Sequence, residues 1–167
     1  QLIQPQEPRF NAGALQHALR ALVAWAEHDV PPPASTVYDV VGGQVHVPPT
    51  AGERRGIQPT VSLTANGGSR AEVAVGATVE LRAEIEVPPG TGTVVAVEWD
   101  VDGSGAYAES DPTVDGASSR CTSSITHTYD EPGTYFVAVR VSAQREGSLR
   151  SPHARVLNLG RARVVVS

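Results

Sequence analysis

The sequence contains neither methionine nor lysine, so its 13 basic residues are all arginines. The longest basic run is Arg54–Arg55, and the net charge is −5. A surface that binds nucleic acid needs a positive stripe to contact phosphates, so we expect no nucleic-acid partner. Because methionine is absent, we expect the chain to be a piece of a longer polypeptide or a processed one.

Aromatic residues make up only 5% of the chain, and no apolar run approaches the ~20 residues that cross a bilayer. A core with few aromatics must rely on valine, alanine, leucine and isoleucine, which favours strands. The sequence therefore predicts a mostly β protein without a membrane span.

Cysteine occurs once, at Cys121, so an internal disulfide is excluded. We expect Cys121 to be a small, partly buried hydrophobic residue. The alternative is a free thiol or an intermolecular link.

The motifs of an enzyme are also missing. There is no Gly-x-Ser-x-Gly nucleophile elbow and no cofactor-binding loop. The histidines do not share the close spacing of zinc ligands; they are His17, His28, His46, His127 and His153. We therefore predict that the chain is not an enzyme, with no catalytic residue and no cofactor except a possible calcium ion.

Residues 1–58 differ in pattern from residues 59–167, and we predict a boundary between them. Residues 11–28 have helical periodicity, with Asn11 as N-cap and three prolines after the helix. The expected apolar stripe consists of Leu15, Leu19, Leu22, Val23 and Ala26. This stripe must be buried either on the following domain or on a neighbour outside the chain. Residues 36–47 predict a short hairpin around Gly42-Gly43, and residues 48–59 predict a linker.

From residue 60 onward the pattern has a period of two, which is typical of strands with one buried face. It is clearest over residues 78–87, where apolar residues alternate with charged ones. Further strands are predicted at 93–100, 123–128, 134–141 and 161–166. Short strands separated by turns, without helices between them, predict an antiparallel, Ig-like β-sandwich.

Two segments carry a more specific pattern, Val97-Glu-Trp-Asp-Val-Asp-Gly103 and Ile125-Thr-His-Thr-Tyr-Asp-Glu-Pro-Gly-Thr-Tyr-Phe-Val-Ala-Val-Arg-Val141. Together they resemble the signature of PKD domains, Ig-like sandwiches found in polycystin and in many bacterial surface proteins and secreted hydrolases. The matching positions are Trp99, Asp100, Asp102, Gly103, His127, Tyr129, Pro132, Gly133 and Tyr135. Residues 110–121 and 142–160 depart from the family, because both connections are longer than usual.

These signature residues are expected to be structural. Trp99 should fill the centre of the sandwich, and Tyr129 should tie a corner through its hydroxyl group. Pro132-Gly133 suits a type II turn, with the glycine at positive φ. His127 is expected to be half-buried at the end of its strand.

Residues 18–35 are weakly similar to the final helix and exit strand of certain secreted α/β-hydrolase-like proteins. This resemblance implies that the chain is the C-terminal accessory portion of an enzyme whose catalytic domain is absent from it.

Acidic residues gather in one loop system, and they offer the only candidate metal site. Asp100 and Asp102 have the spacing that opens a calcium loop, and Asp111 and Asp115 follow in the same loops. The alternative is that these carboxylates accept hydrogen bonds from the amides of tight turns. Calcium-stabilised adhesion is the corresponding function.

The family resemblance implies a non-catalytic interaction or spacer module of a larger secreted or surface-exposed bacterial protein. Its partners would be a polysaccharide, a protein or an upstream domain of the same polypeptide. PKD domains in hydrolases engage substrate through exposed aromatics, for which Phe136 and Tyr107 are the candidates. Phe136 projects opposite to the core residues of its strand, so it either contacts a ligand or is covered by the N-terminal helix.

Overall fold

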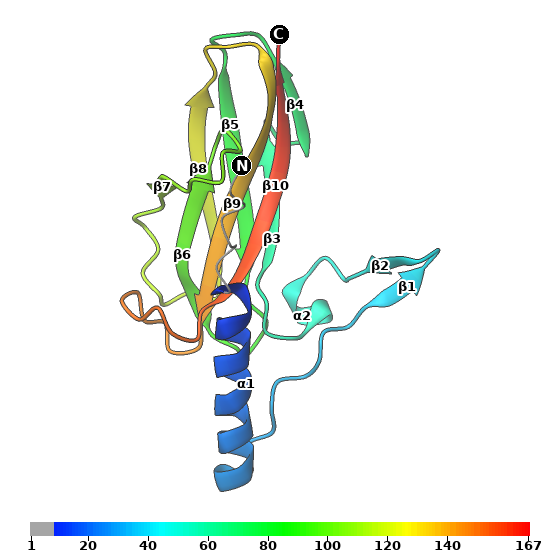
Figure 1. Cartoon of the computed structure of the whole chain (residues 1–167), viewed down its shortest axis with the longest axis vertical. Coiled ribbons are helices and arrows are strands. Elements are labelled where there is room, and N and C mark those ends of the chain that lie inside the picture. Colours follow the sequence, from blue (N-terminus) through cyan, green and yellow to red (C-terminus); the bar gives the residue numbers. More distant parts are fainter. Residues whose placement is uncertain (1–8) are drawn as a thin grey trace, which may run out of the picture.

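The computed structural model describes residues 9–167, which form a β-sandwich with a helix at one end (Figure 1). Two helices, α1 (Arg9–His28) and α2 (Ala51–Arg54), belong to the N-terminal part. The strands are β1 (Asp39–Val41), β2 (Gln44–His46), β3 (Thr60–Ala65), β4 (Arg70–Val73), β5 (Thr78–Glu86), β6 (Thr93–Asp100), β7 (Glu109–Ser110), β8 (Arg120–Thr128), β9 (Gly133–Gln144) and β10 (Val156–Val166). The predicted mostly β sandwich is confirmed.

Two sheets form the sandwich. One has three strands in the order β3-β5-β8, and the other has five in the order β4-β10-β9-β6-β7. All neighbours run antiparallel except β4, which pairs parallel to β10. Strand β6 matches its predicted bounds, whereas β8, β9 and β10 are longer than predicted. The long connection that was expected after β9 is the loop of residues 145–155.

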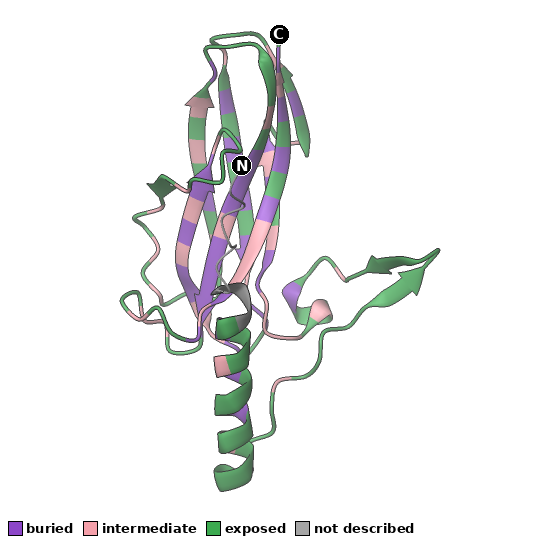
Figure 2. Ribbon diagram, viewed as in Figure 1, coloured by how far each residue is buried: buried purple, intermediate pink, exposed green. Residues whose placement is uncertain are grey.

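The core lies between the sheets, and buried residues alternate with exposed ones along the strands (Figure 2). Trp99 is buried at its centre as predicted, and its indole N–H donates to Ser123 Oγ at 3.3 Å. A β-bulge between Val94 and Ala96 interrupts the alternation of β6. Val94 and Val95 are both buried there, but only Val94 belongs to the core cluster.

Gly160 lets the two sheets approach closely. A Cβ atom at this position would lie 2.7 Å from Val61 Cγ1 and 3.1 Å from Leu63 Cβ, both in strand β3. Because side chains fill the space between sheets completely, a residue without a side chain in β10 makes room for the apolar residues of β3.

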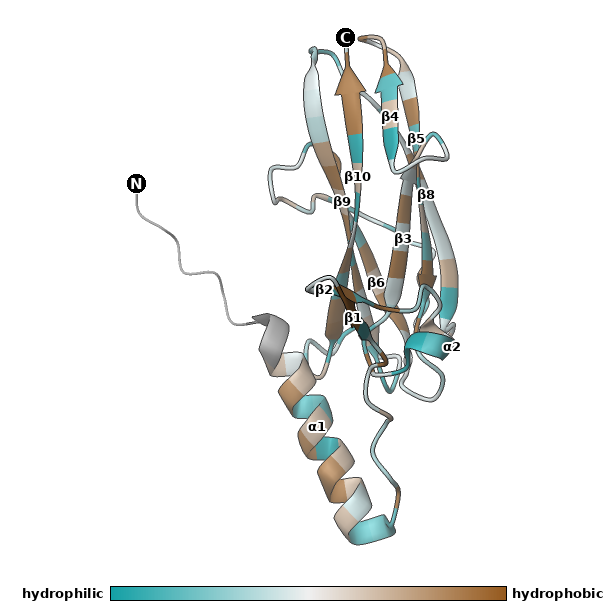
Figure 3. Ribbon diagram, turned by 90° about the vertical axis from the view of Figure 1, so that its right-hand side faces the viewer, coloured by the Kyte–Doolittle hydropathy of each residue, from teal (hydrophilic) through white to brown (hydrophobic). Residues whose placement is uncertain are grey.

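Helix α1 extends away from one end of the sandwich (Figure 3). It ends at His28 as predicted, but it begins at Arg9, so the prediction of Asn11 as N-cap is wrong. A Cβ at Gly13 would collide with the Arg155 carbonyl, which shows how closely the helix backbone approaches the 145–155 loop. Arg20 pairs with Glu146 at 2.6 Å on the same side.

The face of α1 that the sandwich buries is not the predicted one. The buried residues are Gly13, His17 and Ala21, one turn apart from each other. The predicted stripe stays exposed; its large members are Leu15, Leu19, Leu22 and Val23. Gly13 is buried here because the helix backbone lies against the Arg155 carbonyl, where a side chain would not fit. Burial and the nearby charge of Arg145 lower the pKa of His17.

The hairpin predicted around Gly42-Gly43 is confirmed as β1 and β2, which project sideways from the body (Figure 1). The linker expected after it contains the short helix α2, whose N-cap is Thr50. Among the described residues no helix is long and apolar enough to span a bilayer.

Candidate functional site: the outer face of the five-stranded sheet

The outer face of β6, β9 and β10 carries the charged residues Glu98, Arg140, Arg161 and Arg163 and the aromatic residue Phe136. Arg140 in β9 forms a two-pronged ion pair with Glu98 in β6, with Nε and Nη2 at 3.0 and 2.9 Å from the two carboxylate oxygens. The Arg140 guanidinium also lies 4.2 Å from the centre of the Tyr107 ring. The hydrogen bonds that Arg140 donates to Glu98 raise the pKa of Arg140, and burial raises the pKa of Tyr107.

Phe136 lies on the same face and is 62% exposed. Of the two alternatives for Phe136, cover by the N-terminal helix is wrong, because α1 contacts the other end of the sandwich (Figure 1). The cross-strand neighbour of Phe136 is Arg163, and that of Ala138 is Arg161. Both arginines are exposed, because they alternate with the buried Ala162 and Val164. We call the surface formed by Tyr107, Phe136, Arg140, Arg161 and Arg163 the aromatic–arginine face.

The turn that follows β6 borders this face. Asp100 is buried, and its carboxylate accepts hydrogen bonds from the backbone N–H groups of Gly103 (2.9 Å), Ser104 (3.1 Å) and Gly105 (2.8 Å). Gly103 adopts φ +77°, and a Cβ there would lie 2.9 Å from the carbonyl oxygen of Phe136. Asp100 and Gly103 therefore shape the turn and seat it against β9.

The corner between the sheets is tied by Tyr129, as predicted. Its hydroxyl donates to the Val101 carbonyl at 2.8 Å, so the end of β8 is joined to the turn after β6. The half-buried His127 packs edge-on against the Tyr129 ring at 4.6 Å, and Tyr135 packs at 4.2 Å on the same ring. The type II turn predicted at Pro132-Gly133 is wrong, because Gly133 does not have a positive φ and instead begins β9.

Comparison with known families decides what this arrangement of Trp99, Asp100 and Tyr129 represents. The model of the PKD domain matches residues 60–156, more than half of the chain. The chain belongs to the PKD domain family. The two motifs singled out in the sequence lie within this match, and the family predicted from them is confirmed.

Similar solved structures include the PKD domain of an M14-like peptidase from a Thermoplasmatales archaeon. It has 16% sequence identity and a TM-score of 0.46, and the match covers 66% of this chain and 98% of that one. The CARDB domain of a Pyrococcus furiosus protein, solved in complex with di-metal ions, has 14% identity and a TM-score of 0.43. That match covers 66% of this chain and 93% of the other. No curated protein matches the sequence.

PKD domains are generally non-catalytic interaction modules and commonly occur in extracellular or surface proteins. In this PKD domain, the four aspartates singled out as calcium ligands do not come together. Among residues 9–167, no three acidic, histidine or cysteine side chains are grouped as a metal ion would need. Calcium binding stays a prediction, but the geometry favours the alternative in which the carboxylates stabilise turns.

Asp102 supports the same turn as Asp100, whereas Asp111 and Asp115 support two other turns. Asp102 accepts from Ser104 N at 3.0 Å, and hydrogen bonds from the side chain and backbone of Ser104 lower the pKa of Asp102 to about 2. Asp111 accepts from the backbone N–H and hydroxyl of Thr113 at 2.9 and 2.6 Å. Asp115 accepts from Ala117 N at 2.9 Å.

Cys121 is half-buried at the edge of the PKD core, as predicted. Burial raises the pKa of its thiol, and the negative charge of Asp111 adds to that rise. A thiol held in its neutral form is a poor nucleophile, so Cys121 contributes to packing rather than to chemistry.

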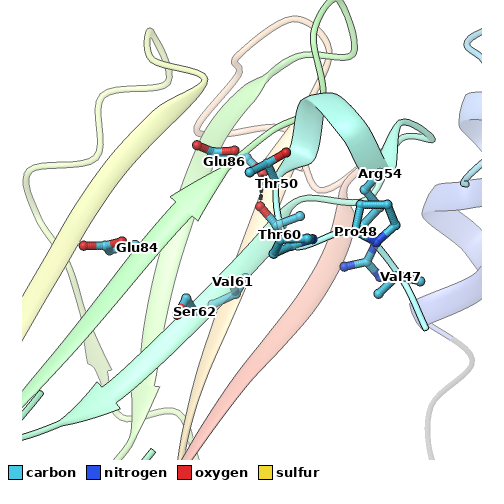
Figure 4. A pocket seen from close by; sticks show the side chains of 10 residues that line it. Val47, Pro48, Thr50, Arg54, Thr60, Val61, Ser62, Glu84 and Glu86 are labelled. Carbon is cyan, nitrogen blue, oxygen red and sulfur yellow. Dashed lines mark hydrogen bonds between the residues drawn. The ribbon is translucent and has the colours of Figure 1, made fainter. Parts of the chain in front are cut away.

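A hollow of about 410 Å³ separates the Val47–Thr50 segment from β3 and β5 of the PKD sandwich (Figure 4). Glu86 lies at its rim. The Glu86 carboxylate accepts from Ala51 N, the first residue of α2, at 3.1 Å and pairs with Arg120 at 2.7 Å. Glu86 therefore fastens the N-terminal part to the sandwich. Sequence reasoning missed this link, because it joins residues 35 positions apart.

The sequence also did not single out Arg161 and Arg163. The available signal was their alternation with apolar residues in the last strand, which places both on the solvent side. What the sequence could not supply is the register of β10 on β9, which sets the two arginines beside Phe136 and Ala138.

Proposed function

We propose that the chain is a non-catalytic interaction module of a larger secreted or surface protein, and that its aromatic–arginine face binds polysaccharide or protein. The observation that carries this proposal is the exposure of Phe136 on the outer side of a central strand. Burying such a side chain stabilises a complex by about 1.5–3 kcal/mol, and here no described part of the chain buries it.

Rigid support favours the same conclusion. The Glu98–Arg140 pair bridges β6 and β9 and holds a guanidinium against Tyr107, so the second aromatic ring is fixed before any ligand arrives. A preorganised aromatic loses little conformational entropy on binding.

The test is a pull-down of the purified chain on immobilised cellulose, chitin, polygalacturonate and gelatin. We expect retention on at least one of these probes, weakened about tenfold or more in Phe136→Ala. Leu149→Ala is the matched control, since Leu149 is an exposed apolar residue in the 145–155 loop rather than on the face. Retention of the wild type on none of the probes, or equal losses in both variants, would refute the proposal.

A second candidate function rests on a different observation. Among residues 12–167, all but three of the exposed large hydrophobic residues lie between positions 15 and 47, in α1, the hairpin and the segment joining them. A cluster of this size, on elements that the sandwich leaves largely uncovered, is typical of a surface that packs against protein. Its occupant would be a catalytic domain of the same polypeptide, as the similarity of residues 18–35 implies.

This candidate is tested on the full coding sequence and on the full-length protein. We expect a Gly-x-Ser-x-Gly motif upstream of residue 1, and a lower melting temperature of the catalytic domain in the Leu19→Ser, Leu22→Ser double variant. A coding sequence without such a motif would refute this second function. It would also be refuted if the double substitution left the melting temperature of the catalytic domain unchanged.

A further inference from the structure

Two arginines on the aromatic–arginine face have no carboxylate partner among the described residues. Arg161 and Arg163 form no ion pair there, as is also true of Arg54, Arg55, Arg145, Arg150 and Arg155 among the described residues. What distinguishes Arg161 and Arg163 is their place: they lie two residues apart on one strand, on the same outer face as Phe136. On a chain of net charge −5, two neighbouring positive charges on one face favour an anionic ligand there.

The carboxylates near these arginines are already engaged. Glu98 is held by Arg140, Glu72 is held by Arg70, and the Asp100 oxygens accept three turn amides. The positive charges of Arg161 and Arg163 therefore remain available to a ligand. Arg161 is also close enough to Tyr107 for its charge to act on the phenol.

The geometry of the pair suits a ligand with repeated anionic groups. Arg161 and Arg163 are two residues apart on one strand, so their Cα atoms are separated by roughly 7 Å along β10. The guanidinium groups project from the same side of the sheet as Phe136, which lies opposite Arg163. A planar guanidinium binds a carboxylate through two parallel hydrogen bonds.

We infer that the aromatic–arginine face binds a carboxylate-bearing polysaccharide, with its acidic groups on Arg161 and Arg163 and a sugar ring against Phe136. This inference rests on the proposed function and names the ligand class of the same face. Five hollows on the described residues lie elsewhere, and none of these five is lined by Phe136, Tyr107, Arg161 or Arg163. A shallow face suits a chain of rings better than a peptide, whose anchor side chains need pockets.

An acidic peptide is disfavoured for another reason. The backbone of β10 pairs with β9 along its whole length, and from Arg163 to Val166 it also pairs with β4, so an extended peptide could not add a strand to β10 beside Arg163. Recognition at Arg163 therefore uses side chains.

The experiment is affinity electrophoresis of the whole chain in gels containing polygalacturonate, its methyl-esterified neutral form, dextran sulfate or polyglutamate. We expect retardation by polygalacturonate, little by the ester, and weakening as salt is raised. The Arg161→Gln, Arg163→Gln variant should weaken binding about tenfold or more. The Arg82→Gln, Arg150→Gln variant removes the same charge elsewhere and should bind like the wild type. Circular dichroism melts check that all variants fold.

The outcomes separate the inference from the function on which it rests. Equal retention by the ester and the acid, lost in Phe136→Ala but not in the Arg161→Gln, Arg163→Gln variant, would overturn the inference and leave the proposed function standing. Stronger retention by dextran sulfate or polyglutamate would also overturn it. Retention by no probe in these gels, together with none in the pull-down, would overturn both.

Discussion

Replacing Tyr129 by phenylalanine removes one hydroxyl group and should destabilise the sandwich. The hydroxyl donates to the Val101 carbonyl at 2.8 Å, and Tyr129 is only 4% exposed, so water cannot easily replace it. Losing a net hydrogen bond costs about 0.5–1.5 kcal/mol, and leaving a carbonyl unsatisfied adds to this. We expect the free energy of unfolding to fall by about 1–2 kcal/mol at pH 7.

The same residue predicts a dependence on alkaline pH. Burial, then the neighbouring Tyr135 and acidic groups, raise the pKa of Tyr129 from 10.0 to about 12. The folded state holds the proton more tightly, so this contribution is complete below pH 10 and is lost as pH rises from about 10 to about 12. The difference between the wild type and Tyr129→Phe should therefore narrow over this interval.

Urea unfolding followed by tryptophan fluorescence, at pH 7 and at steps above pH 9, measures both effects. The matched control is Tyr135→Phe, because the Tyr135 hydroxyl donates at 3.0 Å to Glu131, four residues away and exposed to solvent. Its loss should cost less than about 0.5 kcal/mol. If Tyr129→Phe costs no more than this control, the corner bond does not stabilise the fold and our reasoning is wrong.

Three further outcomes are expected. Gly160→Ala should lower the free energy of unfolding by about 1–3 kcal/mol because its Cβ would meet Val61, whereas Gly52→Ala, with open space around it, should leave the thermal melt unchanged. Because the pKa of Asp102 falls from its ordinary value of 3.8 to about 2 in the folded protein, the Asp102 carboxylate stabilises the fold above pH 3.8. This stabilisation is lost as the pH falls toward about 2. Acid titrations of the wild type and Asp102→Asn should therefore converge at low pH; a constant difference would contradict the assignment. Because turn amides occupy Asp100, melting temperatures in calcium and in chelator should agree, and a calcium-dependent rise abolished by Asp111→Asn would restore the metal site.

The strands that could be predicted are those with one solvent-exposed face. In β5, charged residues alternate with apolar ones, so the period of two is visible without any knowledge of the partner strand. Strands β4 and β7 have four and two residues, too few for a period, and they form only because β10 and β6 lie beside them. Their existence depends on pairing partners distant in sequence, which local pattern cannot reveal.

Helix α1 shows a different limit. Its leucine stripe correctly predicted a helix, because apolar periodicity is a local property of the chain. Which face is buried depends on what the helix meets, and here it meets the backbone of the 145–155 loop. Gly13 fits against the Arg155 carbonyl, where any side chain would collide, so the face with Gly13, His17 and Ala21 is buried and Leu19 and Leu22 stay exposed.

In the candidate site, too, the features set by local motifs could be predicted, and those set by strand register could not. The turn role of Asp100 and the corner role of Tyr129 were predictable, because each acts within or beside a motif with a fixed local geometry. The aromatic–arginine face was not, since it is assembled by register across β6, β9 and β10. The outward position of Phe136 could be predicted from the alternation in its own strand. Its neighbour Arg163 could not, because it reaches Phe136 only through the register of β10 on β9.

The two proposed surfaces lie on separate elements, and this separation has a functional consequence. The apolar residues between positions 15 and 47 belong to α1 and the hairpin, whereas the aromatic–arginine face belongs to β9, β10 and the loop after β6. The helix leaves the sandwich at one end and the hairpin leaves it sideways, so a protein seated on them need not cover Phe136 (Figures 1 and 3). The core cluster, for its part, contains no residue from α1 or the hairpin, so the sandwich does not depend on what that segment contacts. A module built in this way can attach to a neighbouring domain through its N-terminal part while its sheet remains open to a polysaccharide.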